Sequence, residues 1–212
     1  MQRVTAAVQR VVSVNVGAVR SVEWRGRTVT TGIFKQSVTG RVALRGVNFE
    51  GDDQADRSVH GGPDKAVYAY ALEDYEAWRA ADGIETPHGL FGENLTVIGI
   101  DLTMATIGTR WHVGSVVLEV AQPRLPCYKL GIRMNDAQFP KRFMAMGRMG
   151  AYLRVIQEGD VGVNDDIRVI PPPAHGVTLR EMVQALDDPS KAAALLRAPR
   201  LPHFWREVAE RT

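Results

Sequence analysis

Cys127 is the only cysteine of the 212-residue chain, and it lies in the segment QPRLPCYKL at residues 122–130. Two prolines stiffen the backbone that leads to it, and Arg124 and Lys129 would favour a thiolate if they point toward the sulfur. Such a thiolate is a nucleophile or a soft metal ligand. The structural alternative is a buried, inert cysteine. A proline-bounded loop directly after a β-strand pattern favours the site interpretation.

A nucleophilic cysteine also needs a positioned histidine, for which His60 and His88 are the candidates. A single cysteine cannot form an intramolecular disulfide or a four-cysteine cluster, and it suits a reducing compartment. The sequence leaves the two roles of the thiol, nucleophile and metal ligand, open.

The segment Gln122–Arg154 is strongly basic, with seven Lys and Arg residues and one acid, whereas the whole chain has a formal charge of only +2. A local concentration of cations in a balanced protein favours an anionic ligand, most simply a phosphate. The alternative is a solvated surface of helix and loop. Because the segment lacks interleaved aromatic residues, nucleic acid is not expected as a partner.

A second dense segment is Gly51–Tyr70, where Gly61-Gly62-Pro63 predicts a sharp turn whose amides could face an anion. Arg57, His60 and Lys65 are donors around it. The spacing is wrong for a P-loop. Its four aspartates do not match an EF-hand and are interpreted as turn and ion-pair residues; they are Asp52, Asp53, Asp56 and Asp64.

Short strand patterns separated by Gly-rich turns predict a mainly β protein with a barrel or sandwich core. One hairpin is expected within Val14–Phe34, around Arg25-Gly26, and a second around Val113-Gly114, before the run Val116–Val120. Helical spacing predicts surface helices at Glu73–Ala81 and Gln138–Met146. Further strands are predicted at Arg41–Val47, Ala66–Tyr70, Asn94–Ile98, Ala151–Gln157 and Ile167–Ile170.

The composition changes after the triple proline at 171–173, and we place a domain boundary there. Residues 1–173 form the β domain, and residues 174–212 form a segment of three short helices, cut by Pro189, Pro199 and Pro202. Thr178 and Glu181 have the spacing of a capping box.

The overall composition, 45% hydrophobic and 24% charged, is that of an ordinary globular protein. Arg3 and Arg10 interrupt the apolar residues near the N-terminus, so no signal peptide or membrane span is predicted there. We therefore expect a cytoplasmic protein that has no membrane partner.

Three blocks together resemble the MOSC domain family, named for the molybdenum cofactor sulfurase C-terminal domain, in its YiiM-like branch. They are G-D-x-Q-A-D-x-x-V-H-G-G-x-D-K-A-V at 51–67, F-G-E-N-L at 91–95 and Q-P-R-x-P-C-Y-K-L at 122–130. Their order and spacing are specific, and they cover the chain to about Pro171. The Ala- and Leu-rich tail resembles the three-helix C-terminal segment of YiiM-like proteins.

The resemblance implies a β-barrel MOSC core that binds molybdenum cofactor, with Cys127 as the protein thiolate to molybdenum. By position in the family blocks it also implies a set of cofactor-binding residues. These are Arg57, His60, Lys65, Asn94, Arg124 and Arg148, the last in the short block G-R-M-G-A-Y. The cofactor brings its own dithiolene sulfurs and one phosphate, so one protein thiol and a few cations suffice.

Enzymatic members of the family reduce N-hydroxylated compounds, including hydroxylaminopurine-type base analogues, with electrons from a separate reductase. The resemblance therefore implies a detoxifying oxidoreductase. The chain has no cysteine set for an iron–sulfur cluster and no G-x-G-x-x-G fingerprint, so the electron donor must be another protein. The alternative is a non-catalytic carrier of molybdenum cofactor, or of sulfur as a persulfide on Cys127. The C-terminal helices could dock the donor, cap the barrel or form a homodimer contact.

Overall fold

The computed structural model describes residues 8–55 and 61–211. Its largest element is an eight-stranded mixed sheet, ordered β13-β9-β10-β11-β7-β8-β1-β4, in which only β7 and β8 run parallel. The strands are β1 (Arg10–Val16), β4 (Gln36–Val38), β7 (Val67–Ala71), β8 (Leu95–Ile98), β9 (Arg110–Val113), β10 (Val116–Pro123), β11 (Ala151–Gln157) and β13 (Ile167–Val169).

Two smaller sheets complete the β structure. One joins β12 (Gly159–Gly162), β5 (Arg41–Arg45) and β6 (Asn48–Phe49), and the other is the hairpin of β2 (Arg20–Trp24) and β3 (Arg27–Thr31). The predicted turn at Arg25-Gly26 is confirmed. Both residues have positive φ, 51° and 75°, the conformation that a two-residue hairpin turn requires.

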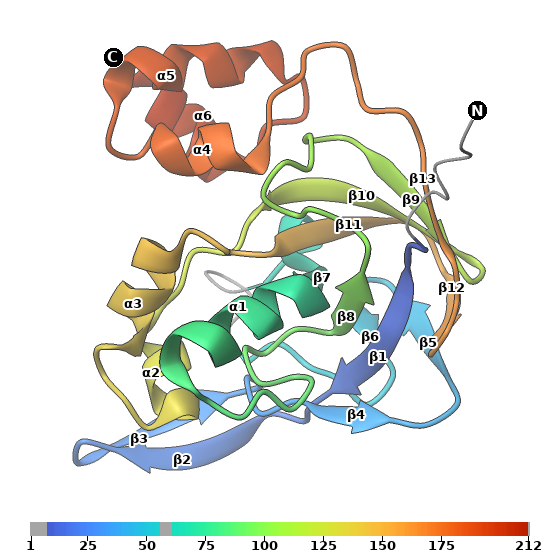
Figure 1. The fold of residues 1–212 in the computed structure, drawn as a ribbon, viewed down its shortest axis with the longest axis vertical. Helices are drawn as coiled ribbons and strands as arrows, with labels where there is room; N and C mark the ends of the chain where they lie inside the picture. The colour runs from blue at the N-terminus through green and yellow to red at the C-terminus, as the bar shows by residue number, and fades with distance from the viewer. Residues whose placement is uncertain (1–7, 56–60, 212) are drawn as a thin grey trace.

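The helices lie around the large sheet (Figure 1). They are η1 (Pro63–Lys65), α1 (Leu72–Asp82), α2 (Tyr128–Met134), α3 (Phe139–Met146), α4 (Leu179–Gln184), α5 (Pro189–Ala192), η2 (Ala193–Arg197) and α6 (His203–Glu210). Figure 1 shows α4–α6 grouped at one end of the molecule and the β2–β3 hairpin at the opposite end. In the part of the chain that the structure describes, none of the helices has the length and apolar character needed to cross a membrane.

The expected closed barrel is not found among the described strands, which form an open large sheet and two small ones. The two ends of the large sheet nevertheless approach each other. Val11 N donates to Asp165 O (2.9 Å), Asn164 N to Val11 O (2.9 Å), and Ile167 N to Gln9 O (2.8 Å). These bonds and an isolated antiparallel bridge between Arg10 and Asp166 join the start of β1 to the start of β13 and the turn before it, without a continuous strand ladder.

Strand β7 divides the interior into two cores. Its residues Val67, Ala69 and Ala71 face a large aliphatic core, whereas Tyr68 and Tyr70 face an aromatic core under α1, α2 and α3. This alternation follows from the two-residue period of a strand, and it explains why all five residues of β7 are buried. Phe91 and Phe143 belong to the aromatic core and bring the loop before β8 against α3.

The predicted strands and the helices at 73–81 and 138–146 are confirmed, with ends shifted by a few residues. Helix α2 was not predicted, because Gly131 and the short length of the segment hide its apolar spacing. The short strands β4, β6 and β12 were also missed. Thr178 and Glu181 form the predicted capping box, in which Glu181 N donates to Thr178 Oγ1 at 3.2 Å.

The C-terminal helices share the aliphatic core with the sheet, through Leu179, Met182 and Trp205. Trp205 is completely buried, and its indole Nε1 donates to Gln122 Oε1 on β10 at 3.0 Å. The boundary at 171–173 remains a prediction. The packing shows, however, that the last 39 residues help to bury the sheet.

We expect Trp205→Ala to lower the free energy of unfolding by about 3–5 kcal/mol, because it removes a buried indole and leaves a cavity. The neighbouring Phe204 is 44% exposed and is the matched control, with an expected loss below about 1 kcal/mol for Phe204→Ala. Urea unfolding followed by circular dichroism measures both. Equal losses would contradict the assigned packing of α6.

Candidate functional site

Segments that lie far apart in the sequence line one pocket beside Cys127. They include the three blocks found in the sequence, together with the end of β3 and part of β11. The lining residues are Thr31, Gly32, Ile33, Lys35, Asp52, Asp53, Gln54, Ala55, Lys65, Ala66, Tyr68, Phe91, Gly92, Asn94, Arg124, Leu125, Cys127, Lys129 and Tyr152. The predicted site residues Lys65, Asn94, Arg124 and Cys127 are therefore brought together.

Cys127 stands at the junction of β10 and α2. It is the N-cap residue of α2 and has extended backbone angles, φ −123° and ψ 174°. Its side chain is half-buried, and it lines the pocket with Arg124 and Tyr152. Strand β10 ends shortly before Cys127, and α2 begins directly after it. These two elements hold the sulfur at the pocket wall, where it remains accessible.

Arg124 is a buried cation, and within residues 8–55 and 61–211 no carboxylate pairs with it. The residue is only 5% exposed, and its guanidinium lies over the rings of Tyr68 and Phe143, with the Cζ atom 5.6 and 5.3 Å from their centroids. Its Nη1 is buried and has no hydrogen-bond partner. Leaving a buried donor unpaired costs about 1–3 kcal/mol, so this atom is suited to an anionic or acceptor group that enters the pocket.

Two phenols next to this guanidinium stay protonated in the neutral range. Burial raises the pKa of Tyr68 and of Tyr152, and the neighbouring Arg124 only partly offsets this effect. The Tyr68 hydroxyl donates to Met149 O at 2.9 Å. The pocket wall beside Arg124 is therefore built from neutral hydroxyl groups and aromatic rings, not from acids.

Asp52 organises the opposite wall of the pocket. Its carboxylate forms a buried ion pair with Lys35 and accepts hydrogen bonds from Asn94 Nδ2 (2.8 Å) and from the backbone N–H of Gly17 (2.9 Å). Burial lowers the pKa of Lys35, although Asp52 acts in the other direction. Asp52 thereby joins the loop after β6 to three other segments: the end of β1, the segment before β4 and the loop before β8.

Asn94 lines the pocket, but its polar atoms are used within the protein. Besides its bond to Asp52, Nδ2 donates to Asn15 O (3.4 Å), and Oδ1 accepts from Tyr68 N (3.1 Å). Its backbone also bonds to Tyr68 and Asn15. Its predicted role in binding the cofactor remains a prediction, and in this structure Asn94 positions Asp52 and Tyr68.

Glu93 anchors the loop before β8. It is fully buried and accepts from Tyr75 Oη (2.5 Å), Gly89 N (2.6 Å) and Thr96 Oγ1 (3.0 Å), while Phe91 N donates to its other oxygen at 3.2 Å. Burial raises the pKa of this carboxyl, opposed by the hydrogen bonds. Glu93 is therefore a structural residue that supports the neighbouring pocket wall.

The predicted turn at Gly61-Gly62-Pro63 leads into η1 and carries Lys65 to the pocket. Gly62 has φ 86°, Lys65 N donates to Gly62 O at 3.0 Å, and Gln54 bridges the two sides of the loop through Gly62 N and Lys65 O. The predicted residues Arg57 and His60 lie outside the described residues. Their assignment remains a prediction.

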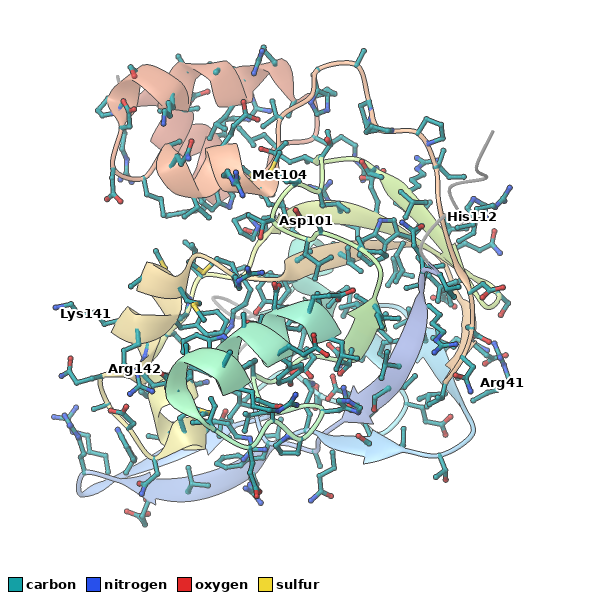
Figure 2. All side chains as sticks on the ribbon, in the orientation of Figure 1. Arg41, Asp101, Met104, His112, Lys141 and Arg142 are labelled. Carbon is teal, nitrogen blue, oxygen red and sulfur yellow. The ribbon has the colours of Figure 1, made fainter. Side chains whose placement is uncertain are left out.

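The basic segment Gln122–Arg154 does not form a single cationic surface. Only Arg124 and Lys129 of its seven cations line the Cys127 pocket. Lys141 and Arg142 lie on the outer side of α3 (Figure 2), and Arg142 pairs with Asp82 and Asp136. The net charge of the segment therefore did not predict which of its cations line the Cys127 pocket.

Arg148 and Arg154 are also ion-paired. Arg148 was predicted to bind the cofactor, but it lines a different pocket and pairs with Asp74 at 2.5 Å. Arg154 is buried and pairs with Glu119 (3.0 Å) and Asp64 (2.5 Å). The bond to Asp64 fixes η1 and thereby the backbone next to Lys65.

His88 does not line the Cys127 pocket and instead packs beside Tyr75, with ring centroids 6.3 Å apart. Burial lowers its pKa. Within residues 8–55 and 61–211, no three His, Cys, Asp or Glu side chains are grouped so that they could hold a metal ion. Among the described residues, the thiol thus has neither a His88 partner nor a preformed set of protein ligands for a metal ion.

Lys35, Tyr68 and Tyr152 are pocket residues that sequence reasoning missed. Lys35 lies outside all three motif blocks, and only the fold brings it to Asp52. The two tyrosines read as ordinary strand residues. Tyr68 in β7 and Tyr152 in β11 are direct register partners. No local spacing in the sequence distinguishes such a pair from two core aromatic residues.

The fold and the site define a mixed-sheet protein in which one accessible thiol, three lysines and a buried guanidinium with one unpaired nitrogen, Nη1, surround a single pocket. A model of the MOSC domain family matches residues 56–168, and the chain belongs to this family.

Its relatives agree with this assignment. The chain is 35% identical over 170 residues to the protein YflK of Bacillus subtilis, covering 80% of this chain and 77% of that protein. It is 34% identical over 152 residues to a protein named "Reductase" of Gibberella moniliformis, covering 70% of this chain but only 27% of that longer protein. The crystal structure of YiiM from Geobacillus stearothermophilus has a TM-score of 0.77 and 27% identity, covering 95% and 97% of the two chains.

We expect Asp52→Asn to destabilise the protein by about 3–5 kcal/mol, because it leaves the Lys35 ammonium buried without a counter-ion. The double variant Lys35→Met/Asp52→Asn should recover a large part of that loss, because both charges are then removed. Urea unfolding of the two single variants and the double variant gives the coupling free energy. Strictly additive losses would contradict the pairing.

Proposed function

We propose that the protein is a molybdenum-cofactor-dependent oxidoreductase that reduces N-hydroxylated compounds, such as hydroxylaminopurine-type bases, to amines. One observation carries the proposal: the only thiol of the chain lines the same pocket as a buried guanidinium whose Nη1 has no hydrogen-bond partner among the described residues. Membership of the MOSC family and a homologue named "Reductase" support it.

The residues present fit this cofactor. A soft metal bound by the cofactor's own sulfurs needs one further soft ligand, and Cys127 is that ligand in our proposal. The unpaired Nη1 of Arg124 suits a phosphate or an acceptor atom of the pterin, and Lys65 and Lys129 add positive charge at the pocket wall. When bound, the cofactor supplies the two-electron redox chemistry that no side chain provides.

The reaction breaks the N–O bond of R–NHOH, takes up two electrons and two protons, and releases R–NH₂ and water. The chain must therefore keep proton donors at the pocket. The Tyr152 hydroxyl lines the pocket and stays protonated at neutral pH because burial raises its pKa. The buried rings of Tyr68 and Phe91 back the same pocket and make that part of its wall apolar.

The electrons come from a separate reductase in this proposal. The 212-residue sequence contains one cysteine, too few for an iron–sulfur cluster. The match to the Gibberella protein covers only 27% of that chain, so in that relative the domain is covalently joined to other sequence. Here the C-terminal helices keep their predicted alternatives, which are donor docking, a cap or a homodimer contact. The burial of Trp205 favours the cap.

Cys127→Ser is the first test. In protein purified from a host that makes molybdenum cofactor, we expect elemental analysis to find near-stoichiometric molybdenum in the wild type and little in the variant, because serine removes the soft ligand with little change in volume. With dithionite as reductant, only the wild type should convert hydroxylaminopurine to the amine.

Full molybdenum content and activity in the variant would refute the role of Cys127. Cofactor transfer to an apo-enzyme without turnover would instead establish the carrier function.

Arg124→Met tests the anion-binding role separately. We expect the unfolding free energy of cofactor-free protein to change by less than about 1 kcal/mol, because the lost ring contacts and the removed unpaired donor offset each other. Molybdenum retained after gel filtration should fall about tenfold or more. Arg206→Met, an exposed cation on α6, is the matched control and should retain the wild-type content. Unchanged retention in Arg124→Met would contradict this role.

A further inference from the structure

A second pocket lies between the C-terminal helices and the body of the sheet, and the mechanism proposed above does not use it. Its volume is about 440 Å³, and its walls come from α4, the turn before β11, the end of β10 and the turn at residues 101–103. Figure 2 shows Asp101 and Met104 in this region, below α4. The volume falls within the range of about 300–1,000 Å³ that is usual for small-molecule sites.

Two arginines on facing segments of this pocket could bind an anion. Arg148 lies on one wall, where its ion pair with buried Asp74 at 2.5 Å fixes its orientation, and its side chain remains 44% exposed. Arg180 lies on the α4 wall, and within the described residues its guanidinium makes no hydrogen bond or ion pair. The only acid on the lining, Asp101, caps its own turn by accepting from Thr103 N and Met104 N.

The remaining lining is largely apolar and comes from Pro123, Met146, Met149, Leu179 and Val183. Methionines adapt to flat ligands and make favourable contacts with aromatic rings.

The wall formed by residues 147–150 packs closely against β7 at Gly150. Gly150 has φ 66°, and a Cβ atom at this position would lie 2.5 Å from Ala69 O, so the backbone approaches β7 as closely as only glycine permits. The turn that carries Arg148 is therefore held in place before any ligand arrives.

We propose that this pocket is a second binding site, for an anionic small molecule with a flat apolar body. The anion lies between Arg148 and Arg180, and the apolar body lies on Met146 and Met149. This inference does not depend on the function proposed for the Cys127 pocket. It also gives a role to Arg148, which the sequence had placed with the cofactor.

The walls of the two pockets are directly linked by the polypeptide chain and by a hydrogen bond. Pro123 lines the second pocket and the next residue, Arg124, lines the first, while Met149 O accepts the hydrogen bond from Tyr68. A ligand in the second pocket would therefore contact the segments that support Arg124 and Tyr68.

The test uses two matched pairs of probes with the full-length protein. Anilinonaphthalene sulfonate and phenylnaphthylamine share an aromatic body, but only the first is anionic; AMP and adenosine form the second pair. Isotope-labelled methionine methyl groups report the location of binding by NMR, because Met146 and Met149 line the second pocket. We expect saturable shifts of these two methyl signals with at least one anionic probe, and affinity at least tenfold lower for its neutral partner.

Arg180→Met is the test variant, because Arg180 is exposed and unpaired and its loss should leave the fold intact. Arg148 is not chosen, since its removal would leave Asp74 buried without a counter-ion. We expect Arg180→Met to weaken binding of the anionic probe about tenfold or more and Arg206→Met to leave it unchanged. Equal affinity in Arg180→Met, shifts confined to other methionines, or no saturable binding of either anionic probe would overturn the proposal.

Discussion

The buried contact between Asp52, Lys35 and Asn94 is the constraint on which the Cys127 pocket depends. Each partner comes from a different part of the chain, and none of the three could be buried alone without a large desolvation cost. Once they are joined, the loop before β8 is fixed to the loop after β6, and Asn94 in turn holds Tyr68 through its side chain and backbone. One wall of the pocket is thereby set before any ligand binds.

A second buried network supports the other side of the pocket. Arg154 joins Glu119 on β10, Asp64 in η1 and the backbone carbonyl of Arg200 in the C-terminal segment. Trp205 adds a hydrogen bond to β10. The C-terminal helices thus contact the strand that ends at Arg124 and Cys127, which makes them part of the support of the site. The polar walls are rigid and internally satisfied, and Arg124 Nη1 is left without a partner at the pocket.

Much of this architecture could be predicted from local signals. Period-two alternation identified the main strands, Arg25-Gly26 identified a hairpin turn, and the capping box at Thr178 identified the start of α4. The motif blocks also identified Lys65, Asn94, Arg124 and Cys127, which line one pocket.

The features that could not be predicted depend on tertiary contacts. Arg148 pairs with Asp74 and lines the second pocket, beside α4. Lys35 pairs with Asp52 and lines the Cys127 pocket. The closed barrel was not found because β1 and β13 meet only at an isolated bridge between Arg10 and Asp166 and a few neighbouring backbone bonds.

The most direct test of the account is to locate molybdenum in crystals of cofactor-loaded protein by anomalous scattering at its absorption edge. The account predicts one strong anomalous peak in the pocket, within bonding distance of the Cys127 sulfur, and density for an anionic group at Arg124 Nη1. A molybdenum peak elsewhere in the molecule, or well-ordered molybdenum that is not bonded to Cys127, would contradict it.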